Sequence, residues 1–208
     1  MSTFKNFIGS IVLIAAIGVL VFSSVSRTQA ATLSAEEEAA ILYMREEEKL
    51  ARDVYVTLYK MWGLQTFQKI SQSEQNHMEA VKTLIDRYGL PDPASRKIGV
   101  FTNPYLQSLY NDLIARGGLS LSEALKVGGA IEEIDILDLR AYLAQTDQPD
   151  IQQVFANIMN GSYNHLRAFV SRLSALFGET YQPQYLDPVT YQEIISADPP
   201  GGRHSRGW

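Results

Sequence analysis

Acidic and histidine side chains recur on the apolar faces of predicted helices. Glu48 falls within the apolar face of a predicted helix over residues 34–63, and Glu74 and His77 lie on the apolar face of the next one, over 67–89. An ionised carboxylate on a core-facing position is costly unless it is paired or binds a metal. The i, i+3 spacing of Glu74 and His77 directs both side chains toward one point. These residue types at this spacing predict a shared cation.

Several acids compete for the corresponding position on the predicted helix over 121–145. Glu132 lies in line with the apolar residues of this helix, and Asp135 lies next to it at i+3, so these two are the predicted inward acids. Glu133 shares a stripe with polar and basic residues, which predicts an exposed face with ion pairs. The pattern does not decide which of Glu132, Glu133 and Asp135 supplies the ligand.

A histidine on the last long predicted helix, over 151–177, completes the set. His165 shares its face with apolar residues, and Ser162 precedes it by three. The predicted metal ligands are Glu48, Glu74, His77, Glu132, Asp135 and His165. The three glutamates carry about −3, or about −4 with Asp135, against about +4 from two divalent ions, so the charges nearly cancel. A symmetric dimetal site in a helix bundle takes two Glu-x-x-His pairs; here Ser162 replaces one Glu.

Each of these features has a structural alternative. A lone glutamate on an apolar face is more often part of a buried ion pair, and a lone histidine is more often a hydrogen-bonded core residue. Two of the three histidines face inward with an acid or serine three residues before them, which favours the metal site. Tyr55 fits core packing and a hydrogen bond to a ligand carboxylate equally well. Glu46 and Glu47 fall off the apolar face, and Glu47→Ala and Glu133→Ala are expected to change stability by about 0.5 kcal/mol or less.

Four long helices must position these residues. Ser34 with Glu37 predicts a capping box at the start of the first helix, and Ser120 with Glu123 predicts another. The connection over 90–119 is long enough to cross the whole bundle and contains a short predicted helix. The expected fold is therefore all-α, a four-helix bundle with one long crossover between the second and third helices. It occupies residues 34–178, followed by a strap over 179–198 and a disordered tail over 199–208.

The N-terminal segment, residues 1–30, predicts export from the cytosol. Lys5 precedes an apolar run over 7–22, and small residues follow it, as in a secretory signal peptide. The run of about sixteen residues is short for a membrane span, which needs about twenty; an uncleaved anchor is the alternative. Both interpretations place the domain in the periplasm or outside the cell, with membrane contact only through this segment.

Composition excludes several classes of site and partner. The chain has no cysteine, which excludes thiolate metal sites and cysteine nucleophiles. Its net charge is −5 and no basic stripe appears, which argues against nucleic-acid binding. Any metal must therefore bind to carboxylates and imidazoles.

Several stretches resemble a known superfamily. Glu48 to Tyr55 reproduces the Glu-x6-Tyr signature of ferritins, bacterioferritins and rubrerythrins, and Glu74-x-x-His77 reproduces the signature of their second helix. Over about residues 34–195 the sequence is similar to a bacterial and archaeal family of ferritin-like proteins named only as a domain of unknown function. The stretches that carry this closer resemblance are 44–55, 73–78, 88–92, 131–135 and 161–169. The resemblance implies a site for two iron ions, or manganese, and dioxygen or peroxide chemistry.

Three functions are compatible with this sequence. The leading one is a dimetal oxidoreductase, a ferroxidase or peroxide-consuming protein, in which Glu74 and one of Glu132 or Asp135 bridge, Glu48 is terminal, and each histidine holds one metal. Its electron donor is external or iron itself is the substrate. The second is a metal carrier or sensor without turnover, and the third is a metal-free helical interaction module. A homo-oligomer is compatible with all three.

Overall fold

The described part of the chain is folded entirely as α-helices. The computed structural model describes residues 32–197. Its helices are α1 (Ala35–Trp62), α2 (Gln65–Tyr88), α3 (Pro104–Gly117), α4 (Leu121–Leu143), α5 (Pro149–Phe177) and α6 (Pro188–Ser196), with no strand in this range. The predicted all-α class is confirmed. No helix in residues 32–197 is long and apolar enough to cross a membrane. The predicted signal segment, 1–30, and the predicted tail, 199–208, lie outside the described residues.

Local sequence explains where α1 and α2 begin and end. The Ser34 hydroxyl accepts a hydrogen bond from the Glu37 amide at 3.1 Å, and the Glu37 carboxylate accepts one from the Ser34 amide at 2.9 Å. The predicted capping box is therefore formed. Gly63 and Gly89 end the two helices with φ of 67° and 68°, a left-handed conformation that glycine adopts without a steric penalty.

The second predicted capping box forms only in part. Ser120 caps α4 by accepting a hydrogen bond from the Glu123 amide at 3.1 Å. The Glu123 side chain does not return to Ser120, because it binds Arg116 at 2.8 Å and Lys126 at 3.0 Å. Two cations outcompete one backbone amide for this carboxylate.

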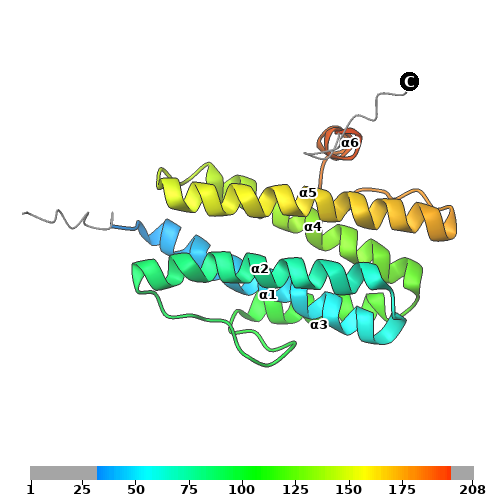
Figure 1. Cartoon of the computed structure of the whole chain (residues 1–208), viewed down its shortest axis with the longest axis horizontal. Helices are drawn as coiled ribbons and strands as arrows, with labels where there is room; N and C mark the ends of the chain where they lie inside the picture. The colour runs from blue at the N-terminus through cyan, green and yellow to red at the C-terminus, as the bar shows by residue number, and fades with distance from the viewer. Residues whose placement is uncertain (1–31, 198–208) are drawn as a thin grey trace, which may run out of the picture. The chain divides into compact units, whose positions relative to one another are not determined.

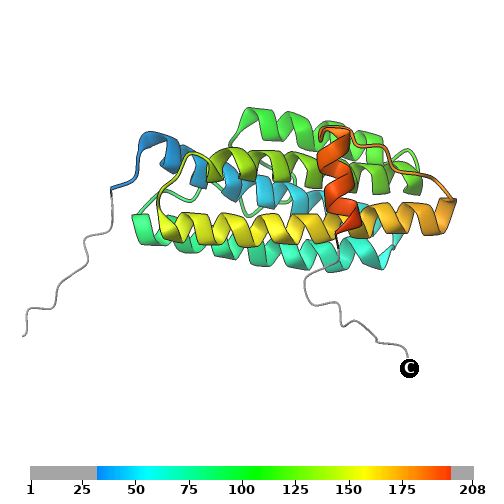
Figure 2. The ribbon, with the colours of Figure 1, turned by 90° about the horizontal axis from the view of Figure 1, so that it is seen from above.

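The long helices pack as two antiparallel pairs. α1 packs chiefly on α2, and α4 chiefly on α5, as Figure 1 shows. The connection after α2 leads into α3, which lies against α1 and α4, and α4 begins at the end of the molecule opposite to the end of α2 (Figure 1). The short helix α6 lies across α5 (Figure 2). The long connection therefore spans the length of the helices, as the sequence predicted.

Two apolar clusters fill the space between the helices, and the predicted ligands lie between them along each helix. One cluster contains Leu50 of α1 and Leu166 of α5, and the other contains Met44 of α1 and Ile158 of α5. On α1, Glu48 lies between the residues of the two clusters. Glu74 and His77 lie between them on α2, and His165 lies between them on α5. A polar layer therefore crosses the middle of the core, enclosed by apolar packing on both sides.

Backbone amides of the long connection bind acids on the outer face of α1. The Glu46 carboxylate accepts hydrogen bonds from the amides of Thr102 at 2.6 Å and Asn103 at 2.8 Å. The Asp53 carboxylate accepts one from the Gly99 amide at 2.9 Å. These contacts hold the connection against α1 and bury both carboxylates.

The C-terminal segment binds α4 in the same manner through Glu133. This carboxylate is fully buried, and it accepts hydrogen bonds from the Tyr181 hydroxyl and the amides of Gln184, Tyr185 and Leu186. The predicted exposed face at Glu133 is therefore wrong. A wheel of α4 alone could not show that residues 179–186 cover it. The predicted strap contains a helix, α6, that the aromatic residues alone did not indicate.

Candidate metal centre

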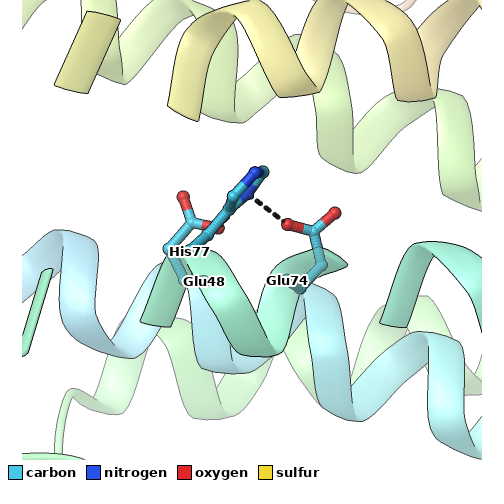
Figure 3. A group of neighbouring side chains, drawn as sticks. All are labelled: Glu48, Glu74 and His77. Carbon is cyan, nitrogen blue, oxygen red and sulfur yellow. Dashed lines mark hydrogen bonds and ion pairs between the residues drawn. The ribbon is translucent and has the colours of Figure 1, made fainter. Parts of the chain in front are cut away.

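Three predicted ligands meet between α1 and α2. His77 Nδ1 lies 2.7 Å from Glu74 Oε2 and 3.2 Å from Glu48 Oε2. Glu74 and His77 are one turn apart on α2, so both point the same way, and Figure 3 shows them with Glu48 directed from α1 and α2 toward α5. Their ligand atoms lie within 4.8 Å of one another, close enough to bind one cation.

A second group of three forms with α4 and α5. His165 Nδ1 lies 2.8 Å from Glu74 Oε1 and 3.5 Å from Glu132 Oε2, and the three ligand atoms again lie within 4.8 Å of one another. Glu74 belongs to both groups, one oxygen facing each histidine. The two imidazole rings stack with centroids 5.5 Å apart. Two neighbouring groups, each able in principle to hold a cation, therefore share one carboxylate.

Asp135 supplies a carboxylate beside these groups, on the side where α5 carries a serine. The Ser162 hydroxyl donates a short hydrogen bond to Asp135 Oδ2, while Asp135 Oδ1 is buried without a partner. Burial raises the pKa of Asp135, and the negative charges of Glu48, Glu132 and Glu74 raise it further. The carboxylate missing from the Ser162 position is therefore compensated in space by one from α4.

Several buried atoms of this cluster have no hydrogen-bond partner. They are Glu48 Oε1, Glu74 Oε1, Asp135 Oδ1 and His165 Nδ1. Glu74 Oε1 and His165 Nδ1 lie within 2.8 Å of each other, yet the contact is not aligned as a hydrogen bond. A buried polar atom without a partner is costly, about 1–3 kcal/mol. Such atoms on four helices converge in the way that ligands of a common cation do.

The electrostatics of the cluster favour positive charge. Burial raises the pKa of Glu48 to about 7. Burial also disfavours ionised Glu74, but the adjacent imidazole groups of His165 and His77, when positively charged, lower its pKa to about 2. Burial would lower the pKa of an imidazole, yet the surrounding carboxylates raise that of His77 to about 11 and that of His165 to about 10. This point in the core therefore stabilises a cation, whether imidazolium or metal.

Tyr55 acts on the cluster through one of its acids. The Tyr55 hydroxyl donates to Glu132 Oε1 at 2.5 Å and lies 3.3 Å from the Gly128 carbonyl oxygen. The side chain is fully buried. Both interpretations open from the sequence hold, because the ring packs against Phe67 and Phe169 in the core and the hydroxyl donates to a predicted ligand. Tyr55 is a positioning residue, because it orients Glu132.

Gly161 is a residue that the helical patterns did not single out. A Cβ atom at this position on α5 would lie 2.6 Å from His77 Cε1 and 2.7 Å from its Nε2, closer than a carbon atom can approach. The absence of a side chain lets the imidazole of α2 pack against α5. A glycine in a helix interior, which costs about 1 kcal/mol relative to alanine, was the available sequence signal.

Glu46 and Glu47 lie outside both three-residue groups, as predicted, but neither is exposed. Both are 3% exposed, so the expected small effect of Glu47→Ala loses its basis. Glu46 is covered by the long connection. Glu47 faces Asp135 and Asp138 of α4. The error has the same cause as at Glu133: the apolar face of one helix does not show what covers its other sides.

The chain has relatives of known sequence and structure. Residues 37–198 match the family model described as an uncharacterized protein domain, DUF2202. The chain is 51% identical over 166 residues to the uncharacterized protein MJ0754 of Methanocaldococcus jannaschii, a match covering 79% of this chain and 89% of that protein. It is also similar to the crystal structure of hypothetical protein MJ0754 from Methanococcus jannaschii DSM 2661, with a TM-score of 0.78 and 50% identity over 80% of this chain and 95% of that one. None of these descriptions states an activity.

Proposed function

The chain belongs to the DUF2202 family, and we propose that it is an exported ferritin-like protein that binds two iron or manganese ions and oxidises Fe(II) or reduces dioxygen or peroxide. Four long helices surrounding a polar layer, with the third reached by a long connection, support a four-helix bundle of the ferritin-like type. The Glu-x6-Tyr and Glu-x-x-His signatures support the same class.

One observation carries the proposal. Two groups of three ligand atoms, one with His77 and one with His165, share Glu74. A carboxylate with one oxygen directed at each of two neighbouring cation positions is the arrangement of a bridged dimetal centre. Mixed carboxylate and imidazole ligands suit iron and manganese in the divalent state.

Charge balance supports the same centre. Four carboxylates, from Glu48, Glu74, Glu132 and Asp135, are buried within the layer. Two divalent ions carry about +4 and four carboxylates about −4, so the filled site is nearly neutral with neutral imidazoles. The partnerless oxygens would then bind a metal ion, which removes the cost of burying them.

Each residue has a defined role in this centre. Glu48 and His77 would hold one ion, Glu132 and His165 would hold the other, and Glu74 would bind both, with Asp135 beside them. Tyr55 orients Glu132, and the apolar clusters on either side of the layer exclude bulk water. Two bound ferrous ions supply electrons for the reduction of dioxygen or peroxide. An external donor must regenerate them, or Fe(II) itself is the substrate, because the chain has no cysteine for an iron-sulfur or rubredoxin-type site.

Metal stoichiometry in a matched pair of variants tests the proposal. Wild-type protein incubated anaerobically with Fe(II) should retain about two more ions per chain than Glu74→Ala, because the shared ligand serves both positions of the dimetal centre. Glu79→Ala, on the exposed side of α2, should bind iron like the wild type. Equal iron content in the Glu74 and Glu79 variants would refute the dimetal centre and leave the interaction-module alternative.

Oxidation kinetics separate an oxidoreductase from a carrier. After Fe(II) loading, exposure to dioxygen or peroxide should oxidise the iron faster than in buffer, and faster than in Glu74→Ala. If the bound iron is oxidised no faster than iron in buffer, the centre binds metal without turnover. Intact-mass analysis of protein from the native host tests export: loss of residues 1–30 is expected, and full-length protein in the cytosol would contradict it.

A further inference from the structure

α1 and α4 run antiparallel in contact, which fixes the residues that face each other between them. At one point the Tyr43 and Tyr142 rings lie with centroids 6.1 Å apart. Further along, the Tyr55 hydroxyl reaches the Gly128 carbonyl oxygen at 3.3 Å. These two contacts show that residue numbers rise along α1 in the direction in which they fall along α4. The stretch of α1 after Tyr43 therefore faces the stretch of α4 before Tyr142.

Two acids from α4 face Glu47 of α1 in this stretch. Glu47 is one turn after Tyr43, Asp138 is one turn before Tyr142, and Asp135 is one further turn along α4. Asp135 and Asp138 both lie close enough to Glu47 for their negative charges to act on it. Burial raises the pKa of Tyr142 to about 12, and the negative charges of Asp138 and Glu47 contribute to this rise.

Glu47 is buried with neither a cation nor a hydrogen-bond donor to compensate it. The side chain is 3% exposed, and neither Oε1 nor Oε2 has a hydrogen-bond partner. Among residues 32–197, no lysine, arginine or histidine lies within ion-pair distance of Glu47 or Asp138. Neighbouring Glu46, by contrast, binds two backbone amides. A carboxylate buried in this way is costly unless a proton or a metal cation neutralises it.

We propose that Glu47 and Asp138 bind a third divalent cation on the α1–α4 side of Asp135, outside the dimetal pair. The two carboxylates carry about −2, which one divalent ion neutralises, and water completes the coordination shell, as is usual for Mn²⁺ or Mg²⁺ on carboxylate oxygens. Glu47 belongs to neither three-residue group, so the ion does not compete for their ligands.

The position is open to solvent on one side. Asp138 is half-buried, and Tyr43 and Tyr142, each one turn from one of the two acids, line an open groove of about 390 Å³. In the proposed site Asp138 is therefore the partly exposed ligand and Glu47 the buried one.

Counting Mn(II) ions by electron paramagnetic resonance tests this site. Free Mn(II) gives a strong signal that binding diminishes, so wild-type protein should bind about three ions per chain, and Glu47→Gln and Asp138→Asn about two each. Glu38→Gln, on the exposed side of α1, should bind like the wild type. Circular dichroism verifies that each variant is folded. Unchanged binding in a folded Glu47→Gln would overturn the proposal.

A second background keeps this result separate from the dimetal centre. Glu74→Ala lacks the shared ligand of the pair, so it should still bind about one Mn(II), and Glu74→Ala with Glu47→Gln should bind none. Loss of all Mn(II) in Glu74→Ala alone would refute the third site while leaving the dimetal centre intact. Full binding in Glu74→Ala, with loss of one ion in Glu47→Gln, would refute the dimetal centre and leave the third site.

Discussion

Two sets of carboxylates are buried in this protein, and they differ in what surrounds them. On the outer faces of α1 and α4, Glu46, Asp53 and Glu133 accept hydrogen bonds from backbone amides of segments that cross the helices. In the layer between the helices, Glu48 and Asp135 each keep a buried oxygen without a partner. Both sets are nearly inaccessible to solvent. Burial alone therefore does not distinguish a structural acid from a metal ligand, and the state of its oxygens does.

The difference has a simple physical origin. A backbone amide is fixed in place by the fold, so a carboxylate that accepts several amides holds two segments together and has no oxygen to spare. A metal ligand must keep at least one oxygen free of donors, at a cost to the metal-free fold of about 1–3 kcal/mol for each buried partnerless group. The first set should therefore govern stability, and the second should govern metal binding.

The largest expected effect on stability comes from Glu133→Ala. This change removes the acceptor of the Tyr181 hydroxyl and of three backbone amides, so the free energy of unfolding should fall by about 3–5 kcal/mol. Metal content should not change, because Glu133 lies in neither ligand group. Urea unfolding and metal analysis of the folded protein measure both, with Glu79→Ala as the control, expected within about 0.5 kcal/mol. A loss of metal at unchanged stability would reverse the assignment of Glu133.

Glu48→Ala should show the opposite behaviour. Without added metal its stability should differ from the wild type by about 1 kcal/mol or less, because the lost carboxylate has a partnerless oxygen and His77 keeps Glu74. At a free metal concentration of 100 times Kd, the wild type should gain about 2.7 kcal/mol for each ion bound. The variant should lose the gain from the ion that Glu48 holds. Melting curves with and without Mn(II) measure this, and an equal gain in both proteins would remove Glu48 from the ligand set.

Gly161→Ala tests the space that the site requires. The new Cβ would overlap the His77 ring, so metal affinity should fall about tenfold, or about 1.4 kcal/mol. Alanine is a better helix former than glycine by about 1 kcal/mol, so the loss of folding stability that the overlap causes is partly offset. Isothermal titration with Mn(II) gives the affinity. Asn160→Ala, at an exposed position of the same helix, should titrate like the wild type.

Tyr55→Phe should have a moderate effect. It removes the donor to Glu132 and leaves the aromatic ring in place, so stability should fall by about 1 kcal/mol. Metal should still bind, with a shift in the absorption or resonance spectrum of the ion held by Glu132. An unchanged spectrum would limit Tyr55 to core packing.

The smallest expected effect concerns an acid at the edge of the long connection. Burial alone would raise the pKa of Asp92, but hydrogen bonds from Arg45 and the Ala94 amide, with the charge of Arg45, lower it below its usual range. Because the pKa of Asp92 is lower in the folded protein, its ion pair with Arg45 stabilises the fold at pH values above the unfolded pKa of about 3.8. This stabilisation is lost as the pH falls through the folded pKa. The loss should be about 0.5 kcal/mol, since the pair is partly exposed. Urea midpoints of wild type and Asp92→Asn should converge at low pH.

The predicted ligands illustrate how far sequence patterns reach. Glu48, Glu74, His77 and His165 interrupt apolar stripes of period 3.6, and the structure brings all of them together because that period sets which side of a helix faces the core. The same pattern favoured Glu132 and Asp135 over Glu133 for the centre, and the first two lie there. Their identity as metal ligands stays a prediction that the variants above test.

The sequence by itself determined the four long helices, the ends of the first two at Gly63 and Gly89, and the face that each long helix presents to the core, because these depend on residues within one or two turns of each other. Only the tertiary structure decided the state of Glu133 and Glu47, because one is covered by residues about fifty positions later and the other faces α4. It also placed Asp135 opposite Ser162, which restores a carboxylate that the fifth helix lacks. Contacts between distant segments depend on how the helices dock, and the periodicity of a single helix carries no information about that.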